Sequence, residues 1–392
     1  MIARARFAKW MHQTKTVHIV PLLRFSSEAT ANTSNHTDNF LRYDADPSSQ
    51  FMEKQNRELM HSLTNMQIER VFRSRPKPFT RPTYHFLTAQ EVKEKLNGAL
   101  RTARRLLLMP PILHIEEDDI KILSKDPEIQ GYTDARIVFI DTTFGLKDRE
   151  RAVLVRHPNG VLETANQLTR RRLIETYFPF KGRRIIVPRM FFGEHFQRVL
   201  DEGKYEFVLD RAIIQFEPFE KDYHRVTSTT YQHISQNSAF DCLRSTRHFG
   251  PMAFFLAWHK LIDNLIIDCI RRDYLRNAVE AICLMYNLNK IPYDAYILEQ
   301  LKRFPRRDDE HFYRKLIDSK TNVVELEIEK TAGKNEDDLK CDEICLKFLD
   351  EYCKSENVTK SNEIKATIQT YREHAEEKRR LLQGLQKAHG IN

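Results

Sequence analysis

Residues Phe240–Asn287 read FDCLRSTRHFGPMAFFLAWHKLIDNLIIDCIRRDYLRNAVEAICLMYN. A polar and basic turn, Arg244–His248, comes first. Gly250-Pro251 then marks a point where a helix can begin, since proline is pre-set for the first helical turn. Almost every residue in Met252–Trp258 is apolar, and from Ile262 onward apolar side chains recur three and four positions apart. This spacing predicts a pair of helices with a wide buried face, and therefore a helical body packed around them.

The first 25 residues have the features of a mitochondrial targeting segment. Five basic residues precede the first acidic one, Glu28, and apolar side chains within residues 3–14 share one face of a helix. A secretory signal would need an unbroken apolar run, whereas His18 and Pro21 interrupt the only candidate. No stretch approaches the ~18–20 apolar residues that span a membrane. We therefore expect a transit peptide and a mitochondrial matrix location; the alternative is a disordered basic tail on a cytosolic protein.

Charge is distributed unevenly along the 392 residues. The chain has 63 Lys and Arg against 55 Asp and Glu, a net charge of +8. Residues 321–392 hold 12 basic and 15 acidic residues, which leaves 51 basic and 40 acidic residues, a net charge of +11, on residues 1–320. Such a basic body suits a polyanionic partner such as RNA, because neutralised phosphates release counterions. The alternative is that the charge serves solubility alone.

Changes in composition divide the chain into segments. The predicted fold is mainly α, a helical body with a small antiparallel β element and an extended N-terminal arm. The expected segments are a mitochondrial transit peptide (1–25), a disordered linker (26–50), a helix and extended basic arm (51–87), an α+β region with a small sheet (88–240), a helical core (241–320) and an acidic helical C-terminal extension (321–392). Opposite charges four residues apart predict that the helices of this extension are exposed to solvent or coiled against a partner.

Local signals predict the elements between residues 53 and 304. Thr88-Ala89-Gln90-Glu91 is a capping box that begins an amphipathic helix, which Pro110-Pro111 ends. The β-branched runs Arg136–Ile140 and Ala152–Val155 predict strands of a small antiparallel sheet, and the turn Pro158-Asn159-Gly160 favours a hairpin. Asn166 is placed to cap the helix that follows, to about Tyr177. A short strand is expected at 185–187. Further helices are expected at 53–71, 190–216, 221–236 and 294–304.

Basic residues gather in clusters that could contact RNA. Residues 70–82 combine five basic groups, three prolines and two aromatic residues, so they predict an extended strap that lies along RNA or packs on protein. The arginines on one face of the 88–107 helix could instead be a solvated face. The β-containing segment that ends in Arg183-Arg184 is the preferred RNA-facing region, although it carries no RNA-recognition, KH or double-stranded-RNA signature. The predicted RNA-binding residues are Arg73, Arg75, Lys77, Arg81, Arg104, Arg105, Arg170, Arg171, Arg172, Arg183 and Arg184.

The sequence offers no catalytic or metal signature. The glycines never form a phosphate-binding loop or a nucleophile elbow, so we expect no enzyme and no cofactor. His248 and His259 are interpreted as structural histidines. Cys242, Cys269 and Cys283 fall at apolar or helical positions and are expected to be buried thiols in a reducing compartment. The remaining three, Cys341, Cys345 and Cys353, lack the partners of a zinc site. The acidic run Glu116–Asp119 lacks the pattern of a calcium loop and is expected to cap the next helix.

The run LRSTRHFGPM followed by KLIDNLIIDCIRRD resembles the mitochondrial small ribosomal subunit protein twenty-two family. The resemblance extends upstream over roughly residues 51 to 290. It includes Pro82-Thr83-Tyr84, the turn Leu108–Pro111, the segment Asp148–Arg183 and Gln215–Pro218. The resemblance implies a protein without catalytic activity in the body of the small subunit, in contact with ribosomal RNA and neighbouring mitochondrial ribosomal proteins.

We therefore expect a structural constituent of the mitochondrial small ribosomal subunit that supports subunit assembly and mitochondrial translation. Its basic residues would neutralise phosphates without reading sequence. Two other classes remain open. The first is a mitochondrial helical adaptor that holds proteins together without direct RNA contact, and the second is an RNA-modifying or RNA-processing enzyme of the matrix.

Overall fold

The computed structural model describes the chain in two units. Described are residues 18–21, 40–73, 84, 86–131, 134–304, 306, 310–311, 313–314, 336–355 and 358–388. The first unit, which we call the sheet unit, joins Met1–Asn39, Ile115–Gln197 and Ile214–Glu217. The second, the helical unit, joins Phe40–His114, Arg198–Ile213 and Pro218–Asn392. The region 88–240, expected as one α+β region, is thus divided between the two units.

Several predicted features lie outside the described residues. Of the predicted transit peptide only His18–Pro21 is described, as strand β1, and the linker is described only from Phe40. Most of the basic strap is likewise outside, including Arg75, Lys77 and Arg81. These predictions remain as they were made for the residues that are not described. Residues 40–50, expected to belong to the disordered linker, are instead ordered: the Tyr43 ring lies 5.3 Å from that of Trp258, and α3 begins at Ser48.

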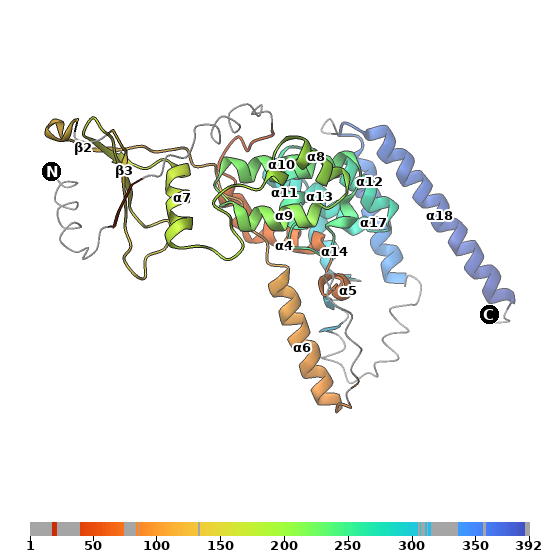
Figure 1. Ribbon diagram of the computed structural model, residues 1–392. Helices are drawn as coiled ribbons and strands as arrows, with labels where there is room; N and C mark the ends of the chain where they lie inside the picture. Colours follow the sequence, from red (N-terminus) through yellow and green to blue (C-terminus); the bar gives the residue numbers. More distant parts are fainter. Residues whose placement is uncertain are drawn as a thin grey trace. The chain divides into compact units, whose positions relative to one another are not determined.

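Helices make up most of the described chain, so the prediction of a mainly α fold is confirmed (Figure 1). Their bounds are α3 (Ser48–Met52), α4 (Lys54–Thr64), α5 (Ile68–Val71), α6 (Ala89–Leu106), α7 (Gln167–Tyr177), α8 (Gly193–Asp201), α9 (Tyr205–Gln215), α10 (Lys221–Gln236), α11 (Phe249–Trp258), α12 (Asp263–Arg271), α13 (Leu275–Leu288), α14 (Tyr296–Lys302), α17 (Glu336–Tyr352) and α18 (Ser361–Ala388). Short 3-10 turns are η1 (Pro127–Ile129), η2 (Arg189–Phe191) and η3 (Phe240–Cys242). None of the described helices is long and apolar enough to cross a lipid bilayer.

Helix α11 forms the centre of the helical unit. Its residues Phe249–Ala257 are all buried, as expected for a helix that is apolar on every side. Helices α4, α10 and α13 pack against it, and Figure 1 shows α10 and α13 close beside it. The predicted core is therefore confirmed. The expected pair of helices is instead a set of three, α11 to α13, because the chain turns at Lys260 and Asp273, which have φ of 57° and 64°.

Two other helices predicted as continuous are interrupted. The helix expected over 53–71 is divided into α4 and α5 at Asn65, with φ of 49°. The helix expected over 190–216 is divided into α8 and α9, with Gly203 at φ of 69° between them. Glycine and asparagine enter this left-handed region at low cost. The prediction was wrong at both breaks because the apolar pattern on either side continues through them.

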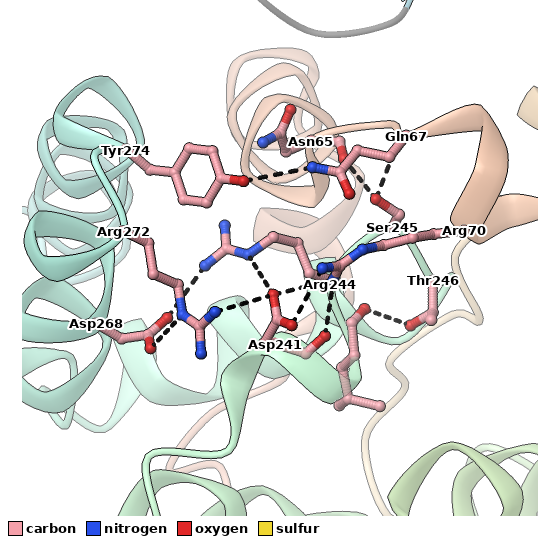
Figure 2. Close-up of polar contacts among 11 residues, drawn as sticks. Asn65, Gln67, Arg70, Asp241, Arg244, Ser245, Thr246, Asp268, Arg272 and Tyr274 are labelled. Carbon is pink, nitrogen blue, oxygen red and sulfur yellow. Dashed lines mark hydrogen bonds and ion pairs between the residues drawn. The ribbon is translucent and has the colours of Figure 1, made fainter.

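A fully buried arginine organises the turn before α11 (Figure 2). The Arg244 side chain has no exposed surface, and its Nη2 donates to Asp268 on α12 at 3.2 Å. Its Nε lies 3.8 Å from Asp241. The guanidinium carbon lies 5.1 Å from the ring centre of Phe249 and 4.5 Å from that of Tyr274. These carboxylates and aromatic rings compensate for part of the lost hydration of this cation, although its Nε and Nη1 are buried without a hydrogen-bond partner among the described residues.

The two carboxylates that face Arg244 also bind exposed arginines. Arg70 on α5 donates to both oxygens of Asp241, at 2.9 and 3.1 Å, and Arg272 donates to Asp268 at 2.8 Å. Burial raises the pKa of Asp241, but the hydrogen bonds and charge of Arg70, with the charge of Arg272, outweigh burial and lower this pKa. Asp241 therefore stays ionised. The network joins α5, η3 and α12, which lie far apart in sequence.

Ser245 explains the break between α4 and α5. Its backbone N–H donates to the carbonyl of Thr64 at 3.0 Å, and its hydroxyl donates to the carbonyl of Asn65 at 2.6 Å. The same hydroxyl accepts from the backbone N–H of Gln67 at 3.1 Å. These contacts satisfy backbone groups that a continuous helix would have paired internally. A residue 180 positions away therefore sets the helix boundary.

The turn closes with a second polar cluster, in which His248 and Arg247 both bind Asp210. His248 is buried, and its Nε2 lies 2.9 Å from Asp210 on α9, which also accepts from Arg247 Nε at 3.0 Å. Burial lowers the pKa of His248 despite the opposing effect of Asp210, so the neutral ring donates to the carboxylate. Burial would raise the pKa of Asp210, but the bonds from His248 and Arg247 hold it well below its usual range. The interpretation of His248 as structural thus fits its position.

The C-terminal helices dock on the helical unit. Cys345, Leu349, Ile364 and Ile368 are buried; α17 packs against α13, and α18 packs against α12. The expectation of helices exposed to solvent or coiled against a partner is therefore wrong for their inner faces. These faces are short apolar stripes within charged sequence, which makes them hard to recognise.

Asp263, on the first turn of α12, holds the connection between α17 and α18. It accepts from the backbone N–H groups of Thr359 and Lys360, each at 2.9 Å, and from the Thr359 hydroxyl at 2.6 Å. The Tyr352 hydroxyl donates to its other oxygen at 3.3 Å. Asp263 is buried, so these donors replace the water that its carboxylate has lost.

The sheet unit contains a five-stranded antiparallel sheet. Its strands lie in the order β1-β3-β4-β5-β2. The bounds are β1 (His18–Pro21), β2 (Ile122–Lys125), β3 (Ile137–Ile140), β4 (Val153–Arg156) and β5 (Val161–Thr164). Val138, Val155 and Ile174 belong to one buried cluster, which shows that α7 packs on this sheet. The predicted small antiparallel sheet is confirmed, whereas strands β1 and β2 were not predicted.

Predicted turns and caps in both units are confirmed. The Thr88 hydroxyl accepts from Glu91 N–H at the start of α6, and Asn166 caps α7 by accepting from Thr169 N–H at 2.9 Å. The hairpin turn ends at Gly160, which has φ of 80°, and a Cβ added there would lie 2.1 Å from the carbonyl oxygen of Asp126. Only glycine fits this close approach.

One prediction in the sheet unit was wrong. No strand forms at 185–187, because the backbone N–H and C=O of Arg184 bond to the buried side chain of Gln215.

The acidic run Glu116–Asp119 was expected to cap the next helix, and α7 is the next α-helix in the chain. Asp118 accepts from Gln167 N–H at 2.7 Å, on the first turn of α7, so this prediction is confirmed.

Two of the three cysteines expected to be buried, Cys269 and Cys283, are buried free thiols, whereas Cys242 is exposed. Cys341, Cys345 and Cys353, for which no burial was predicted, are also buried free thiols. No group of three His, Cys, Asp or Glu residues that could hold a metal ion occurs in the part of the chain that the structure describes.

Replacement of Asp268 by alanine should strongly destabilise the helical unit. This change leaves the Arg244 guanidinium buried without its closest carboxylate, so we expect the free energy of unfolding to fall by about 3–5 kcal/mol. Arg272→Met removes a cation that is 41% exposed from the same carboxylate and should cost less than about 1 kcal/mol. Urea denaturation followed by circular dichroism measures both. Equal losses in the two variants would contradict the structural role of Arg244.

Candidate nucleic-acid interface

The structure describes eight of the eleven basic residues predicted to bind RNA. They separate into residues that bond within the chain and residues that face solvent. Hydrogen-bonded within the chain are Arg104, Arg170 and Arg183, and Arg171 lies near the ring of Phe216. The side chains of Arg73, Arg105, Arg172 and Arg184 make no hydrogen bond or ion pair with any described residue; Arg172 is half-buried and the other three are exposed.

Neighbouring arginines on the last turn of α6 have different environments. Arg104 donates from Nε and Nη2 to Glu310 Oε1, at 3.1 and 2.8 Å. Arg105 is exposed. Leu100, Ala103 and Leu107 pack the opposite face of the helix into a buried cluster, which fixes the direction of both arginines. The sequence predicted this basic face but not the internal bond to Glu310, 206 residues away.

The arginine triplet on α7 is also divided. Arg170 Nη2 donates to the carbonyls of Asp148 and Arg149, at 2.6 and 2.9 Å, and thereby holds the connection between β3 and β4. Burial lowers the pKa of Arg170, and the nearby charge of Asp148 only partly opposes this. The Arg171 guanidinium lies 5.4 Å from the ring centre of Phe216. Of the triplet, Arg172 is the residue best placed to contact a phosphate.

Arg183 is the internal anchor of the loop after α7. It pairs with Glu175 at 3.1 Å and Glu217 at 2.7 Å, and its Nε donates to the carbonyl of Ile214 at 2.9 Å. Burial alone would lower the pKa of Arg183, but the bonds and charges of the two glutamates outweigh burial and raise it. Glu175 is itself buried. Removing Arg183 would therefore leave a buried carboxylate without its cation.

The loop anchored by Arg183 presents an aromatic and basic surface. Phe180 is 57% exposed, and Lys181 and Arg184 are exposed without an acidic partner among the described residues. Gln215 is fully buried and binds the backbone of Arg184 through both ends of its amide. The backbone is thus fixed while three side chains remain available. We call Phe180, Lys181 and Arg184 the basic loop surface.

Comparison with known proteins shows the family to which the chain belongs. Residues 49–290 match the family described as Mitochondrial 28S ribosomal protein S22. The chain belongs to this family. It is similar to the small ribosomal subunit protein mS22 of Mus musculus and to that of Bos taurus. Each is 33% identical over 239 residues, which cover 61% of this chain and 67% of the relative.

The S22 family match includes the candidate interface but not the whole chain. All eleven predicted residues, from Arg73 to Arg184, fall within residues 49–290. Helices α17 and α18 fall outside this range, as does the predicted transit peptide. Membership of a mitochondrial ribosomal protein family implies a mitochondrial protein with a structural rather than a catalytic role.

Sequence reasoning missed two features of this S22 family member. Phe180 and Lys181 were recognised only as part of a basic loop, although Phe-Pro-Phe-Lys-Gly combines an aromatic residue, a cation and turn residues. Arg151 was not singled out, yet it is buried, and its guanidinium carbon lies 3.7 Å from the ring centre of Phe178. A cluster of charged residues in the sequence is easily recognised and is usually exposed. Arg151 is an isolated arginine buried within its own loop, so the sequence gives no comparable signal.

Arg183 and Arg184 should respond differently to the same substitution. Arg183→Met should lower the unfolding midpoint by several degrees, because it leaves the buried Glu175 without its cation, at a cost of about 3 kcal/mol. Arg184→Met should leave the midpoint within about 1 °C, since an exposed side chain without a partner contributes within about ±0.5 kcal/mol. Differential scanning fluorimetry compares the two variants. A larger loss for Arg184→Met would show that the two arginines have been assigned the wrong roles.

Proposed function

We propose that the chain is a structural constituent of the small ribosomal subunit in the mitochondrial matrix. There it binds ribosomal RNA and neighbouring ribosomal proteins, and so supports subunit assembly and mitochondrial translation. Support comes from membership of the S22 family, whose relatives are named as small ribosomal subunit proteins. Further support comes from the net charge of +11 on residues 1–320.

The basic loop surface is the observation that best supports RNA contact. Lys181 and Arg184 can neutralise phosphates, and Phe180 can stack on an unpaired base. The internal bonds of Arg183 and Gln215 hold the loop in place before binding, which reduces the entropy lost on association. Arg172 adds a further cation in the same unit, and Arg73 and Arg105 offer separate phosphate contacts on the helical unit.

A second candidate function has a specific observation in its favour. Arg104, Arg170 and Arg183, all predicted to bind RNA, already bond to acceptors within the chain. If the remaining cations were also engaged by proteins, the chain would be a helical adaptor without direct RNA contact. The two functions differ in one measurable respect, which is the dependence of ribosomal RNA binding on the basic loop surface.

Charge reversal of this surface should weaken RNA binding. We expect Lys181→Glu with Arg184→Glu to reduce affinity for small-subunit ribosomal RNA fragments about tenfold or more. The dependence of log affinity on log salt should become shallower by roughly 0.7–0.9 per lost phosphate contact. Filter binding at several salt concentrations, with sedimentation of the tagged chain from mitochondrial lysate, provides the measurement.

The matched control reverses two cations that are also exposed but already paired. Arg198 and Lys204 both bond to Glu202, at 3.2 and 2.6 Å, so Arg198→Glu with Lys204→Glu makes the same change in net charge. This control should keep most of the affinity. If the Lys181 and Arg184 variant binds RNA as tightly as the control and still sediments with the small subunit, the adaptor function would be favoured.

A further inference from the structure

The connection between β3 and β4 is a long loop with a fixed shape. It runs through residues 141–152, whereas hairpin connections usually have two to five residues. Asp141 at its start is buried; its carboxylate accepts from the backbone N–H and the hydroxyl of Thr143, at 2.9 and 2.6 Å. The backbone N–H of Asp141 donates to the carbonyl of Ala152 at 3.0 Å, which closes the base of the loop.

Arg151 holds the loop from inside. Its Nη1 donates to the carbonyls of Asp141 and Thr143, at 3.2 and 2.9 Å, and its Nη2 donates to the carbonyl of Leu146 at 2.9 Å. The guanidinium is buried and stacks on Phe178 at 3.7 Å. Removing this cation from water is costly, and fixed carbonyls compensate only if the loop keeps one conformation. The bonds from Arg151 therefore hold the loop backbone in one conformation.

A second arginine binds the far side of the loop. Arg170 on α7 donates to the carbonyls of Asp148 and Arg149. Within the loop, Glu150 N–H donates to the carbonyl of Lys147 at 2.8 Å. Backbone carbonyls along the loop are thus bound to donors of the same unit.

Phe144 is the large side chain that this loop leaves in solvent. Its relative exposure is 101%, and a Cβ added to the neighbouring Gly145 would meet nothing within 4 Å. A single exposed apolar residue is ordinary on a protein surface. Here, however, the exposed ring stands on a loop that two arginines hold in place. An exposed aromatic side chain on a loop with a fixed backbone has the properties of an interface anchor, because little backbone entropy remains to be lost on binding.

The charge of the loop indicates the chemistry of its partner. The exposed charges next to Phe144 are two cations, Lys147 and Arg149, and two anions, Asp148 and Glu150. This balance gives no attraction to a phosphate backbone. The basic loop surface in the same unit is, by contrast, free of exposed acids. A protein pocket lined by apolar side chains and edged by mixed charges fits the Phe144 loop better than RNA does.

We propose that Phe144 is an anchor that inserts into an apolar pocket of a neighbouring protein of the small subunit, and that Arg151 positions it. This inference rests on the proposed function, since it takes its partner from the same particle. It adds a protein contact at a defined residue to an RNA contact at the basic loop surface.

A photocrosslinking experiment on the full-length chain tests the anchor. The photoreactive variant Phe144→p-benzoyl-L-phenylalanine is expressed in mitochondria, small subunits are purified, and crosslinked products are identified by mass spectrometry. We expect one predominant crosslinked protein, at a yield at least tenfold above that of Asn159→p-benzoyl-L-phenylalanine. Asn159 is exposed on the other hairpin turn of the same sheet and serves as the control.

Each other outcome overturns the proposal in a different way. Crosslinks from position 144 to ribosomal RNA would show base stacking in place of protein docking. If small subunits contain the variant but yield no crosslink above the control, Phe144 is not an anchor, and the proposed function is unaffected. If the unsubstituted chain is absent from small subunits, both the proposed function and the anchor role of Phe144 are contradicted.

Truncation of the ring gives an independent test. Phe144→Ala should lower retention of the chain on salt-washed small subunits at least tenfold, as for truncation of a central aromatic anchor, while Phe144→Leu should retain most of it. Because the ring is exposed in the free chain, neither change should alter the thermal midpoint. Full retention of the alanine variant would contradict the proposal.

Discussion

A guanidinium that leaves water must meet fixed acceptors, and this requirement shapes the whole chain. Arg244 meets it in part, through one hydrogen bond to Asp268, the charge of Asp241 and two aromatic rings, while Nε and Nη1 have no hydrogen-bond partner among the described residues. These contacts join η3, α12 and the start of α13. The adjacent Ser245 ends α4 through its bonds to the backbone around Asn65. The fully apolar α11 then begins directly after this turn. Without it, the helices around α11 would lack the contacts that fix their ends.

The same requirement operates in the sheet unit at smaller scale. Arg151 fixes the loop between β3 and β4, and Arg183 fixes the loop after α7. Both cations use acceptors from their own unit. The side chains of Phe144 and Arg184, on the same two loops, stay exposed. Some arginines of the chain therefore stabilise its own loops through internal bonds, and others, such as Arg184, are exposed to solvent. For a member of a ribosomal protein family, this division matters because net charge alone does not show which cations are available to a polyanion.

The sequence predicted features whose signals are local. The capping box at Thr88, the cap at Asn166 and the turn at Gly160 each depend on residues within a few positions of one another. The apolar run of α11 likewise revealed the core. Features set by distant partners were missed: the helix break at Asn65 depends on Ser245, and the docking of α17 and α18 depends on Asp263, about 96 residues away. For the interface, sequence found the clusters but could not separate Arg183 from Arg184, because Gln215 and Glu217 decide their roles.

The most direct measurement of this division is the reactivity of individual arginines toward phenylglyoxal, read by mass spectrometry in the free chain and in purified small subunits. In the free chain Arg105, Arg172 and Arg184 should react faster than Arg151, Arg183 and Arg244, since the latter are held by internal acceptors. In the small subunit the first three should become protected, and the last three should change little. Slow reaction of Arg184 in the free chain, or equal reactivity of Arg184 in both states, would contradict the assignment of available and internal cations.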